Sequence, residues 1–356
     1  MKALILTGHF GMGHTSAAQA VEEEIKKKYK DAEIIKVDVV EYVYPEVSRY
    51  VYMGFEAMVS KLHNIYNILN RMDEHGFLIP FKNTAAKRFS QLVTETKPDI
   101  MISTWPPGSK YISEFRKATG DRTPFIACVT DMIAHSVWIS CDADAYIVGD
   151  IYTKENMVAR GVNPEKIFAA GIPVREIFKK NDIRKSAAGK EILISGGGLG
   201  LIPEAEGLLE RLERMDNVHV TVITGRNEKL CESLSGRFRN ADILGYVDDM
   251  EKYMEKADMI ISKAGGITLF ESIYSEVPLY IIKPFLEQEK DNARYVEEKH
   301  IGKVVWGRKG SHGDNLADIL ENEAELADMK KNIRDVKKSL KGKSIGQVMD
   351  MLQIGA

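Results

Sequence analysis

Cysteine is scarce in this chain of 356 residues. The three cysteines, Cys128, Cys141 and Cys231, are widely spaced and odd in number. They match no disulfide framework and no zinc-binding spacing. Because disulfides persist mainly in oxidising compartments, we expect reduced thiols and a cytoplasmic protein.

Long apolar runs are also missing. No stretch approaches the ~20 apolar residues that a membrane-spanning helix needs. The apolar opening, Ala3 to Leu6, is about one strand long, which is too short for a secretory signal. The formal net charge of −3 gives no general attraction to nucleic acid. We therefore expect a soluble protein that binds no nucleic acid and at most associates with a membrane surface.

The composition of the chain, 44% hydrophobic and 28% charged, is typical of a globular protein. Its length suits two domains. Short apolar runs alternate with helical patterns almost throughout, which predicts parallel strands joined by crossover helices. The expected strands begin near Lys2, Ala32, Pro98, Pro124, Ala145, Lys190, Val218, Ala241, Asp258 and Pro278. The predicted fold class is therefore α/β, with two doubly wound domains.

A charged, small-residue stretch around a Gly-x-Pro break, Ala169 to Lys190, is typical of a hinge. We therefore predict an N-terminal domain at 1–175 and a C-terminal domain at 176–339. The last segment, roughly Asp328 to Leu352, has a helical pattern. Its end, 340–356, is a candidate to pack back on the first domain.

One segment, Pro45 to Val93, interrupts this rhythm with helical patterns and clustered aromatic residues. One interpretation is a helical cap buried against the N-terminal sheet. The other is an apolar ledge for a lipid acceptor, with basic residues beside it for anionic headgroups. The residues concerned are Phe77, Leu78, Phe81 and Lys82, followed by Lys87 and Arg88.

The loop after the first expected strand, Gly8 to His14, carries three glycines and two histidines. It lacks the Gly-Lys-Ser/Thr of a phosphate-binding loop. Its glycine spacing does not fit the Gly-x-Gly-x-x-Gly dinucleotide fingerprint either, although Asp38 stands near the end of the second strand, where that fingerprint has an acid. A dinucleotide site is therefore a weak alternative.

Three further loops follow expected strands in the second half, at Gly196 to Gly200, Gly225 to Asn227 and Lys263 to Glu271. Ligands of doubly wound sheets bind at such strand ends. The third loop opens a helix, whose unpaired backbone amides suit a diphosphate. Within it Thr268 offers a hydroxyl donor, and Glu271 suits either a helix cap or two ribose hydroxyls.

Eight short motifs occur in an order that resembles one family of glycosyltransferases. They are GMGHTSAAQAV, VTDMIAHSVW, GIPVREIF, GGGLG, TGRN, GYVDDM, SKAGGIT and QEKDNA. The family includes monogalactosyldiacylglycerol synthases, processive diacylglycerol glucosyltransferases and, more distantly, the lipid II N-acetylglucosaminyltransferase. The resemblance implies the GT-B fold, in which two Rossmann-like domains face a cleft, and sugar transfer from a nucleotide diphosphate without an active-site metal.

The resemblance also implies a set of donor-binding residues. The loop Lys263 to Thr268 would hold the diphosphate, Glu271 the ribose, and the backbone of Tyr246 and Val247 the uracil. The full set is Gly13, Gly197, Gly198, Gly200, Gly225, Arg226, Asn227, Tyr246, Val247, Lys263, Ala264, Gly265, Gly266, Thr268, Glu271, Gln288, Glu289 and Asn292. The last three would bind the sugar.

On the acceptor side, the resemblance implies catalytic roles for His14 and Asp131. An imidazole accepts a proton near neutral pH, and a nearby carboxylate would raise its basicity. His9 is a second candidate for the base. The alternatives are structural: His14 would cap a helix or fill a polar cleft, and Asp131 would satisfy backbone amides.

We therefore expect a hexosyltransferase that uses UDP-glucose or UDP-galactose, needs no cofactor, and glycosylates a lipid. The favoured acceptor is diacylglycerol at the anionic inner face of the cell membrane, to which the protein would bind peripherally. The rival acceptors are lipid II-type polyprenyl diphosphates and soluble compounds. The rival functions are a non-hydrolysing UDP-sugar epimerase and a non-catalytic sensor.

Overall fold

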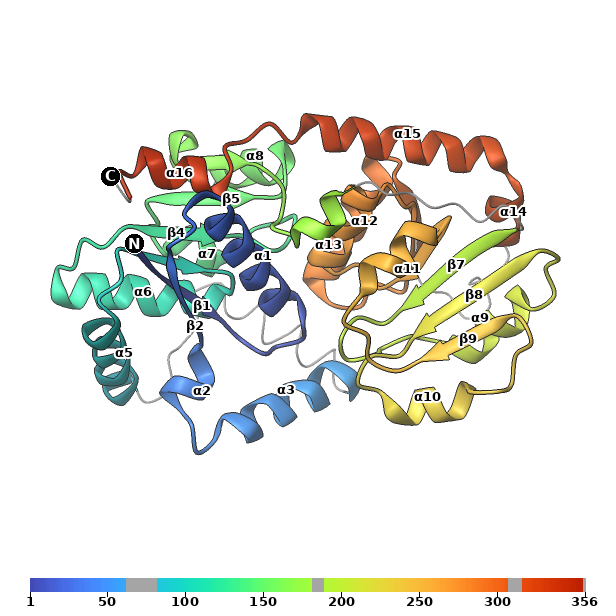
Figure 1. The fold of residues 1–356 in the computed structure, drawn as a ribbon, viewed down its shortest axis with the longest axis horizontal. Helices are drawn as coiled ribbons and strands as arrows, with labels where there is room; N and C mark the ends of the chain where they lie inside the picture. The colour runs from blue at the N-terminus through green and yellow to red at the C-terminus, as the bar shows by residue number, and fades with distance from the viewer. Residues whose placement is uncertain (62–81, 181–188, 307–315, 355–356) are drawn as a thin grey trace. The chain divides into compact units, whose positions relative to one another are not determined.

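The computed structural model describes residues 1–61, 82–180, 189–306 and 316–354 (Figure 1). The chain divides into two compact units, one of residues 1–176 with 340–356 and the other of residues 177–339. In the described residues each unit contains a six-stranded sheet whose paired strands all run parallel. The predicted α/β fold with two doubly wound domains is confirmed.

The sheet of the first unit has the strand order β2-β1-β3-β4-β5-β6. The strands are β1 Lys2–Thr7, β2 Glu33–Asp38, β3 Ile100–Ser103, β4 Phe125–Cys128, β5 Ala145–Val148 and β6 Ile167–Ala169. All except β6 were expected. That strand has three residues and lies at the start of the predicted hinge, so it is too short to produce a pattern.

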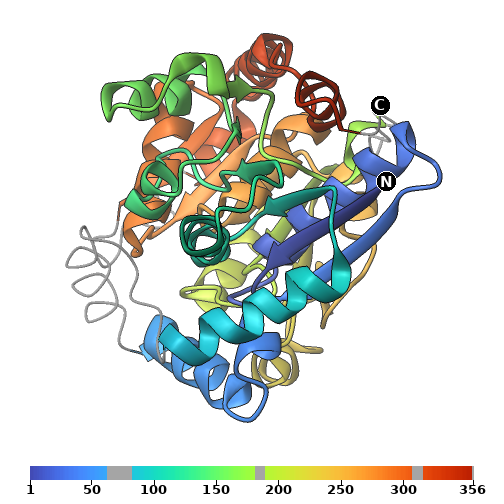
Figure 2. The ribbon, with the colours of Figure 1, turned by 90° about the vertical axis from the view of Figure 1, so that its left-hand side faces the viewer.

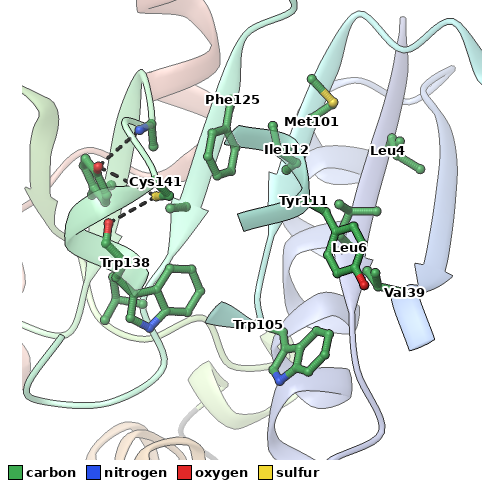
Figure 3. Packing of buried hydrophobic residues seen from close by; sticks show 14 of the residues in the cluster. Leu4, Leu6, Val39, Met101, Trp105, Tyr111, Ile112, Phe125, Trp138 and Cys141 are labelled. Atoms are coloured by element: carbon green, nitrogen blue, oxygen red, sulfur yellow. Dashed lines mark hydrogen bonds between the residues drawn. The ribbon is translucent and has the colours of Figure 1, made fainter. Parts of the chain in front are cut away.

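Alternate residues of these strands are buried on opposite faces of the sheet. Leu4 and Leu6 of β1 belong to a cluster that includes Trp138 (Figure 3). Ala3 and Ile5 of the same strand belong to the cluster on the other face. Each large apolar side chain contributes about 1.5–3 kcal/mol when it is fully buried. Burial on both faces explains why these strands appear in the sequence as continuous apolar runs.

Helices cover both faces of this sheet. The helices α1 Gly13–Lys28 and α16 Ile345–Met351 contribute apolar residues to the cluster that contains Ala3 and Ile5. Most of the other helices contribute to the cluster on the opposite face, which contains Leu4 and Leu6. Figure 2 shows α5 and α6 side by side. The other helices of this unit, in the ranges that the structure describes, are α2 Val39–Val43, α3 Ser48–Lys61, α5 Lys82–Thr96, α6 Pro106–Thr119, α7 Ser136–Ser140 and α8 Ile151–Ala159, with short 3-10 turns at Pro164–Lys166 and Glu176–Lys179.

The segment with the expected helical pattern, Asp328 to Leu352, contains the end of α15 Glu323–Ser339 and all of α16. The first helix ends at Ser339, and between the two helices Gly342 N–H donates to Ala169 O at 2.9 Å. A Cβ at Gly342 would lie 2.4 Å from Ala169 C, so only glycine allows this approach. Ser344 then caps α16, where its hydroxyl accepts from the backbone of the third helical residue.

The helix α16 packs against α1 within the first unit. Val348 and Met349 share an apolar cluster with Val21 of α1. Asp350 at the edge of this contact accepts a hydrogen bond from the Tyr29 hydroxyl at 2.7 Å. The first and last described residues of the chain therefore belong to the same unit, as Figure 1 shows.

The second unit has the strand order β12-β11-β10-β7-β8-β9. Its strands are β7 Lys190–Ser195, β8 Val218–Ile223, β9 Ala241–Leu244, β10 Met259–Ser262, β11 Leu279–Ile282 and β12 Gly302–Val305. Its helices are α9 Ala205–Leu212, α10 Glu228–Leu234, α11 Met250–Lys256, α12 Gly266–Ser275, α13 Glu287–Glu298, α14 Leu316–Glu321 and α15. The strand order reverses between β7 and β10, where ligands of such sheets bind.

Candidate active site

The loop between β1 and α1 carries both candidate histidines. Gly11 has a φ of +81°, which favours glycine, and its N–H donates to His9 O at 3.0 Å, so the loop is folded back on itself. Gly8 lies under Trp105, whose ring would be 2.9 Å from any added Cβ. The helix α1 begins at Gly13, which places His14 in its first turn.

The imidazole of His14 is held at Nδ1. This atom lies 2.9 Å from Thr104 O and 3.3 Å from Thr130 Oγ1. Because a carbonyl oxygen only accepts, Nδ1 carries the hydrogen and Nε2 keeps its lone pair. Burial lowers the pKa of His14 to about 4, against the bond to Thr104, which raises it. The side chain is therefore neutral at pH 7 and presents Nε2 as a proton acceptor.

Asp131 lies half-buried in the loop that follows β4, next to the buried Thr130. Its predicted role as the carboxylate that supports His14 stays a prediction. Two other residues of the same stretch have structural roles. His135 caps α7, where its Nδ1 accepts from Val137 N at 3.3 Å, and Trp138 is buried in the core.

The second candidate base, His9, has a carboxylate partner. Its Nδ1 lies 3.1 Å from Asp38 Oδ2, and its backbone N–H donates to the same oxygen at 2.8 Å. The other oxygen of Asp38 accepts from Tyr52 Oη at 2.5 Å and from Glu41 N at 2.9 Å. Asp38 therefore caps α2 and fixes His9, and this accounts for the acid at the end of β2 without a dinucleotide.

The glycines after β7 and β8 pack backbone against backbone. A Cβ at Gly200 would lie 1.8 Å from Thr224 O, and one at Gly225 would lie 2.7 Å from Gly198 O. The N–H of Arg226 donates to Gly198 O at 3.0 Å. Gly200 and Gly225 also have positive φ angles of +61° and +56°. These two loops therefore need glycine in order to meet each other.

The other predicted residues of these loops differ in role. Asn227 is used within the protein, since its Nδ2 donates to Gly200 O at 3.2 Å and its Oδ1 accepts from Leu230 N at 3.2 Å. The Arg226 side chain is exposed. Gly197 lies beneath the stem of Lys263, whose Cε would be 3.4 Å from an added Cβ. The contact brings the loop after β7 next to the loop after β10.

The helix α12 offers an anion-binding terminus. Gly265 precedes it in an extended conformation without a side-chain cap, and its first turn contains no acidic residue. The first backbone N–H groups of a helix have no partner within it, and the helix dipole adds about half a positive charge there. Thr268 is half-buried in this turn. Glu271 is buried and sixth in the helix, beyond the reach of a cap.

The start of α13 is tied to the same loop. Lys263 Nζ lies 3.3 Å from Glu289 Oε1, and Glu289 is only 3% exposed. The fully buried Asn292 donates from Nδ2 to the carbonyl of Ala264 at 2.9 Å. The structure therefore gathers Lys263, Glu289 and Asn292, which are well separated in sequence, beside the N-terminus of α12.

Four further predicted donor residues lie elsewhere, two of them in helices and two in the loop after β9. Gln288 Oε1 is buried and has no hydrogen-bond partner among the described residues, which is unusual for a buried amide oxygen. After β9, the side chain of Tyr246 is 49% exposed and Val247 is half-buried. Gly13 is the first residue of α1 and so belongs to the other unit.

The predicted acceptor residues are only partly described. Phe77, Leu78 and Phe81 lie outside the described residues, and Lys82 is the first residue of α5. Farther along this helix the side chain of Lys87 is exposed. The guanidinium of Arg88 donates to the carbonyl of Val43 at 3.1 Å and so ties α5 to the end of α2.

Sequence reasoning did not identify the groups that hold the two histidines. Thr104 and Thr130 contact His14, and Tyr52 contacts Asp38. Thr104 directly follows β3 and Thr130 lies two residues after β4, so their strand-end positions were an available signal. Tyr52 gave no such signal, because it lies on α3 among several other aromatic residues.

Two family models match most of the chain. The model of monogalactosyldiacylglycerol (MGDG) synthase matches residues 14–174, and that of the glycosyltransferase family 28 C-terminal domain matches residues 192–344. The processive diacylglycerol beta-glucosyltransferase of Bacillus subtilis (strain 168) is 32% identical, over 94% of this chain and 91% of its own length. The enzyme of the same description from Bacillus cereus (strain G9842) is 30% identical, over 94% and 89%.

Solved structures share the fold at low sequence identity. MurG of Acinetobacter baumannii is similar with a TM-score of 0.62 and 16% identity, over 99% of both chains. MnaA of S. aureus, solved with UDP, has a TM-score of 0.65 and 12% identity, over 99% of this chain and 97% of its own. A UDP-GlcNAc 2-epimerase from Neisseria meningitidis has a TM-score of 0.61 and 13% identity, over 99% and 100%. Fold alone therefore does not separate a transferase from an epimerase.

Sequence identity does separate them. The full-length matches are to glycosyltransferases, the family models cover both units, and the motif order agrees with the same family. The two six-stranded parallel sheets agree with the GT-B fold that this resemblance implied. The chain belongs to the glycolipid-forming glycosyltransferase family that contains the monogalactosyldiacylglycerol synthases and the processive diacylglycerol β-glucosyltransferases.

Proposed function

We propose that this protein transfers glucose from UDP-glucose to the free hydroxyl of diacylglycerol. The observation that carries the proposal is the similarity, over more than nine-tenths of the chain, to enzymes described as processive diacylglycerol beta-glucosyltransferases. Galactose remains the rival sugar, because the model that matches the first unit is that of a galactolipid synthase. The two sugars differ at one hydroxyl, which a donor screen resolves directly.

In this proposal the second unit binds the donor. The free amides at the start of α12 and the ammonium of Lys263 would stabilise the charge that develops on the departing diphosphate. Preorganised donors of this kind contribute a few kcal/mol each to transition-state stabilisation. Gln288, whose oxygen has no partner in the described part of the chain, and Glu289 would accept hydrogen bonds from the sugar.

The first unit would supply the base. His14 Nε2 takes the proton of the acceptor hydroxyl while that oxygen attacks the anomeric carbon and UDP departs. The bond from Nδ1 to Thr104 O keeps the imidazole in the required tautomer and orientation. Its lowered pKa keeps the side chain neutral at physiological pH. His9 stays the alternative base, and variants of the two residues distinguish them.

The exposed apolar face of helix α3 supports the proposal that the acceptor is a membrane lipid. One face of α3 points toward Phe10, which contacts Tyr52 and Phe55 at ring-centroid distances of 4.9 and 4.8 Å. The opposite face is apolar and exposed, with Tyr50 at 70% and Met53 at 55%. Such a face suits shallow insertion into an anionic membrane.

No helix among the described ranges has the length and apolarity to cross a bilayer. We therefore propose peripheral attachment to the inner face of the cell membrane.

The membrane proposal is tested by flotation with liposomes that contain anionic lipid. Wild type should float, and the double variant Tyr50→Ser with Met53→Ser should remain at the bottom while it still binds UDP. The matched control is Ile151→Ser with Val158→Ser, which removes two exposed apolar side chains from α8. Equal flotation of all three proteins would assign α3 to another role.

The catalytic proposal is tested by a screen of donors and acceptors with lipid extraction of the products. The full-length protein should convert diacylglycerol and UDP-glucose to a glucolipid faster than it uses UDP-galactose. Incubation with UDP-glucose alone should leave the nucleotide sugar intact. A new UDP-sugar from that incubation would indicate an epimerase, and UDP binding without turnover on any acceptor would indicate a sensor.

A further inference from the structure

His9, Asp38 and Glu41 bring three polar groups together at the carboxyl ends of β1 and β2. One imidazole nitrogen of His9 and one carboxylate oxygen each of Asp38 and Glu41 lie within 4.8 Å of one another. His9 Nδ1 is 3.8 Å from Glu41 Oε1. The side chains of His9 and Glu41 are 43% and 58% exposed, whereas that of Asp38 is 5% exposed. A buried carboxylate thus holds an exposed imidazole beside an exposed carboxylate.

The arrangement fixes which atoms of this group are available. Both oxygens of Asp38 accept hydrogen bonds from neighbouring groups, including Tyr52 Oη and two backbone N–H groups. With Nδ1 of His9 directed to Asp38, the lone pair of Nε2 lies on the opposite side of the ring. The exposed groups are therefore one imidazole acceptor and one carboxylate, both suited to hydroxyl donors.

Aromatic rings lie beside this polar group. Phe10 follows His9 in the chain, stacks on Trp105 at a centroid distance of 4.9 Å and 17°, and meets the edge of Tyr52. His9 itself contacts Tyr52 with its ring centroid 6.0 Å away. A few polar groups against an aromatic wall are typical of a small-molecule subsite. Diacylglycerol has a single hydroxyl, which the base already takes, so a polar subsite beyond it has no partner in that lipid.

A glycosylated acceptor does present further hydroxyls. In a second round of transfer, a hydroxyl of the first sugar must reach the base, and its other hydroxyls then lie around that point. His9 lies in the loop after β1, which the bond from Gly11 N to His9 O folds back, and His14 lies in the first turn of the helix that this loop enters. Hydroxyls of the sugar on the side toward this loop would meet the exposed side of His9 and Glu41.

We propose that His9 and Glu41 bind hydroxyls of the sugar on a glycosylated lipid acceptor. They thereby determine the preference of the enzyme for a second transfer over the first. This inference rests on the proposed function, since it requires a glucolipid product that returns as an acceptor. Asp38 and Tyr52 act as positioning residues that hold the imidazole.

The test uses the full-length protein with diacylglycerol and glucosyldiacylglycerol as separate acceptors and UDP-glucose as the donor. Glu41→Gln should lower the ratio of kcat/KM for glucosyldiacylglycerol to that for diacylglycerol by roughly tenfold, the scale of a lost hydrogen bond to a charged group. Tyr52→Phe should lower the same ratio in the same direction. The matched control is Glu46→Gln, an exposed acid that lies between α2 and α3, which should preserve it.

Several results would overturn the inference. An unchanged ratio in an active, folded Glu41→Gln enzyme overturns it, and so does an equal loss on both acceptors, which would mean that the residue acts on the catalytic loop as a whole. If EDTA lowers the wild-type ratio and abolishes the effect of the substitution, the three groups hold a divalent cation instead. Wild-type protein that glucosylates neither lipid would refute the proposed function, and the inference with it.

Discussion

The loop after β1 in the first unit and the loops after β7 and β8 in the second are all rich in glycine, but glycine serves different purposes in them. In the second unit, Gly200 and Gly225 allow two backbones to meet. In the first unit, Gly11 has no atom near a Cβ position, and side chains carry the chemistry. A glycine-rich loop in this fold therefore has one of two roles: it packs its backbone against another loop, or it presents a reactive side chain. The atoms that surround each glycine distinguish the two roles.

The largest expected effect tests the side-chain role of the first loop. His14→Ala should lower kcat by roughly 10²–10⁴, the usual contribution of a general base, with little change in UDP affinity. Steady-state kinetics and titration calorimetry measure the two quantities. The control His219→Ala removes an imidazole that pairs with Glu191 in the second unit, and it should leave kcat near the wild-type value. A loss of UDP binding in His14→Ala would make it a donor ligand and His9 the base.

The second prediction concerns a buried carboxylate of the donor unit. Glu271→Ala should weaken UDP binding by roughly 1–3 kcal/mol, which is about 5–150-fold in Kd, through loss of hydrogen bonds to ribose. Titration calorimetry measures this effect, with Glu298→Ala on the exposed side of α13 as the control. An unchanged Kd in a folded variant would remove Glu271 from the donor site.

The third prediction tests the packing role of glycine in the second unit. Gly200→Ala requires the chain to move, because the new Cβ would lie 1.8 Å from Thr224 O at a φ of +61°. We expect a loss of about 1–3 kcal/mol and a fall in Tm of roughly 3–10 °C. Gly207→Ala, within α9 and with no atom near the new Cβ, should be neutral or slightly stabilising. Equal melting temperatures for the two variants would refute the packing explanation.

A smaller effect is expected from pH. The pKa of His14 is lowered to about 4 in the folded protein, so the base stays neutral well below the ordinary histidine value of 6.5. The acid limb of the kcat profile that belongs to this residue should therefore lie near pH 4 and not near pH 6.5. Between these values the unfolded state binds more protons, so His14 reduces stability as the pH falls through this window. An acid limb near pH 6.5 that disappears in His14→Ala would contradict the assignment.

The smallest expected effect is that of chelation. The proposed donor site uses helix amides and Lys263 to balance the diphosphate charge, so EDTA should leave the rate of glucose transfer within about twofold of its original value. Treatment of the protein with chelator, followed by assays with and without added manganese, measures this directly. Activity that is lost and then restored by manganese would show that a cation takes part.

The sequence alone predicted most of the strands and the fold class. Apolar runs and helical patterns are local properties, so ten of the twelve strands in the described residues were expected from them. The missed strands, β6 and β12, have three and four residues. The motif order also sufficed to indicate the family, because each motif is short and its residues are close in the chain.

Only the tertiary structure decided how the candidate residues are held. His14 meets Thr104 across 90 residues, and His9 meets Asp38 across 29, because the sheet sets β1 between β2 and β3. The break at Gly342 likewise depends on the approach of Ala169 from a distant part of the chain. Contacts of this kind follow from strand order and backbone distance, which leave no period in the sequence, whereas helices and strands follow from side-chain patterns within a few residues.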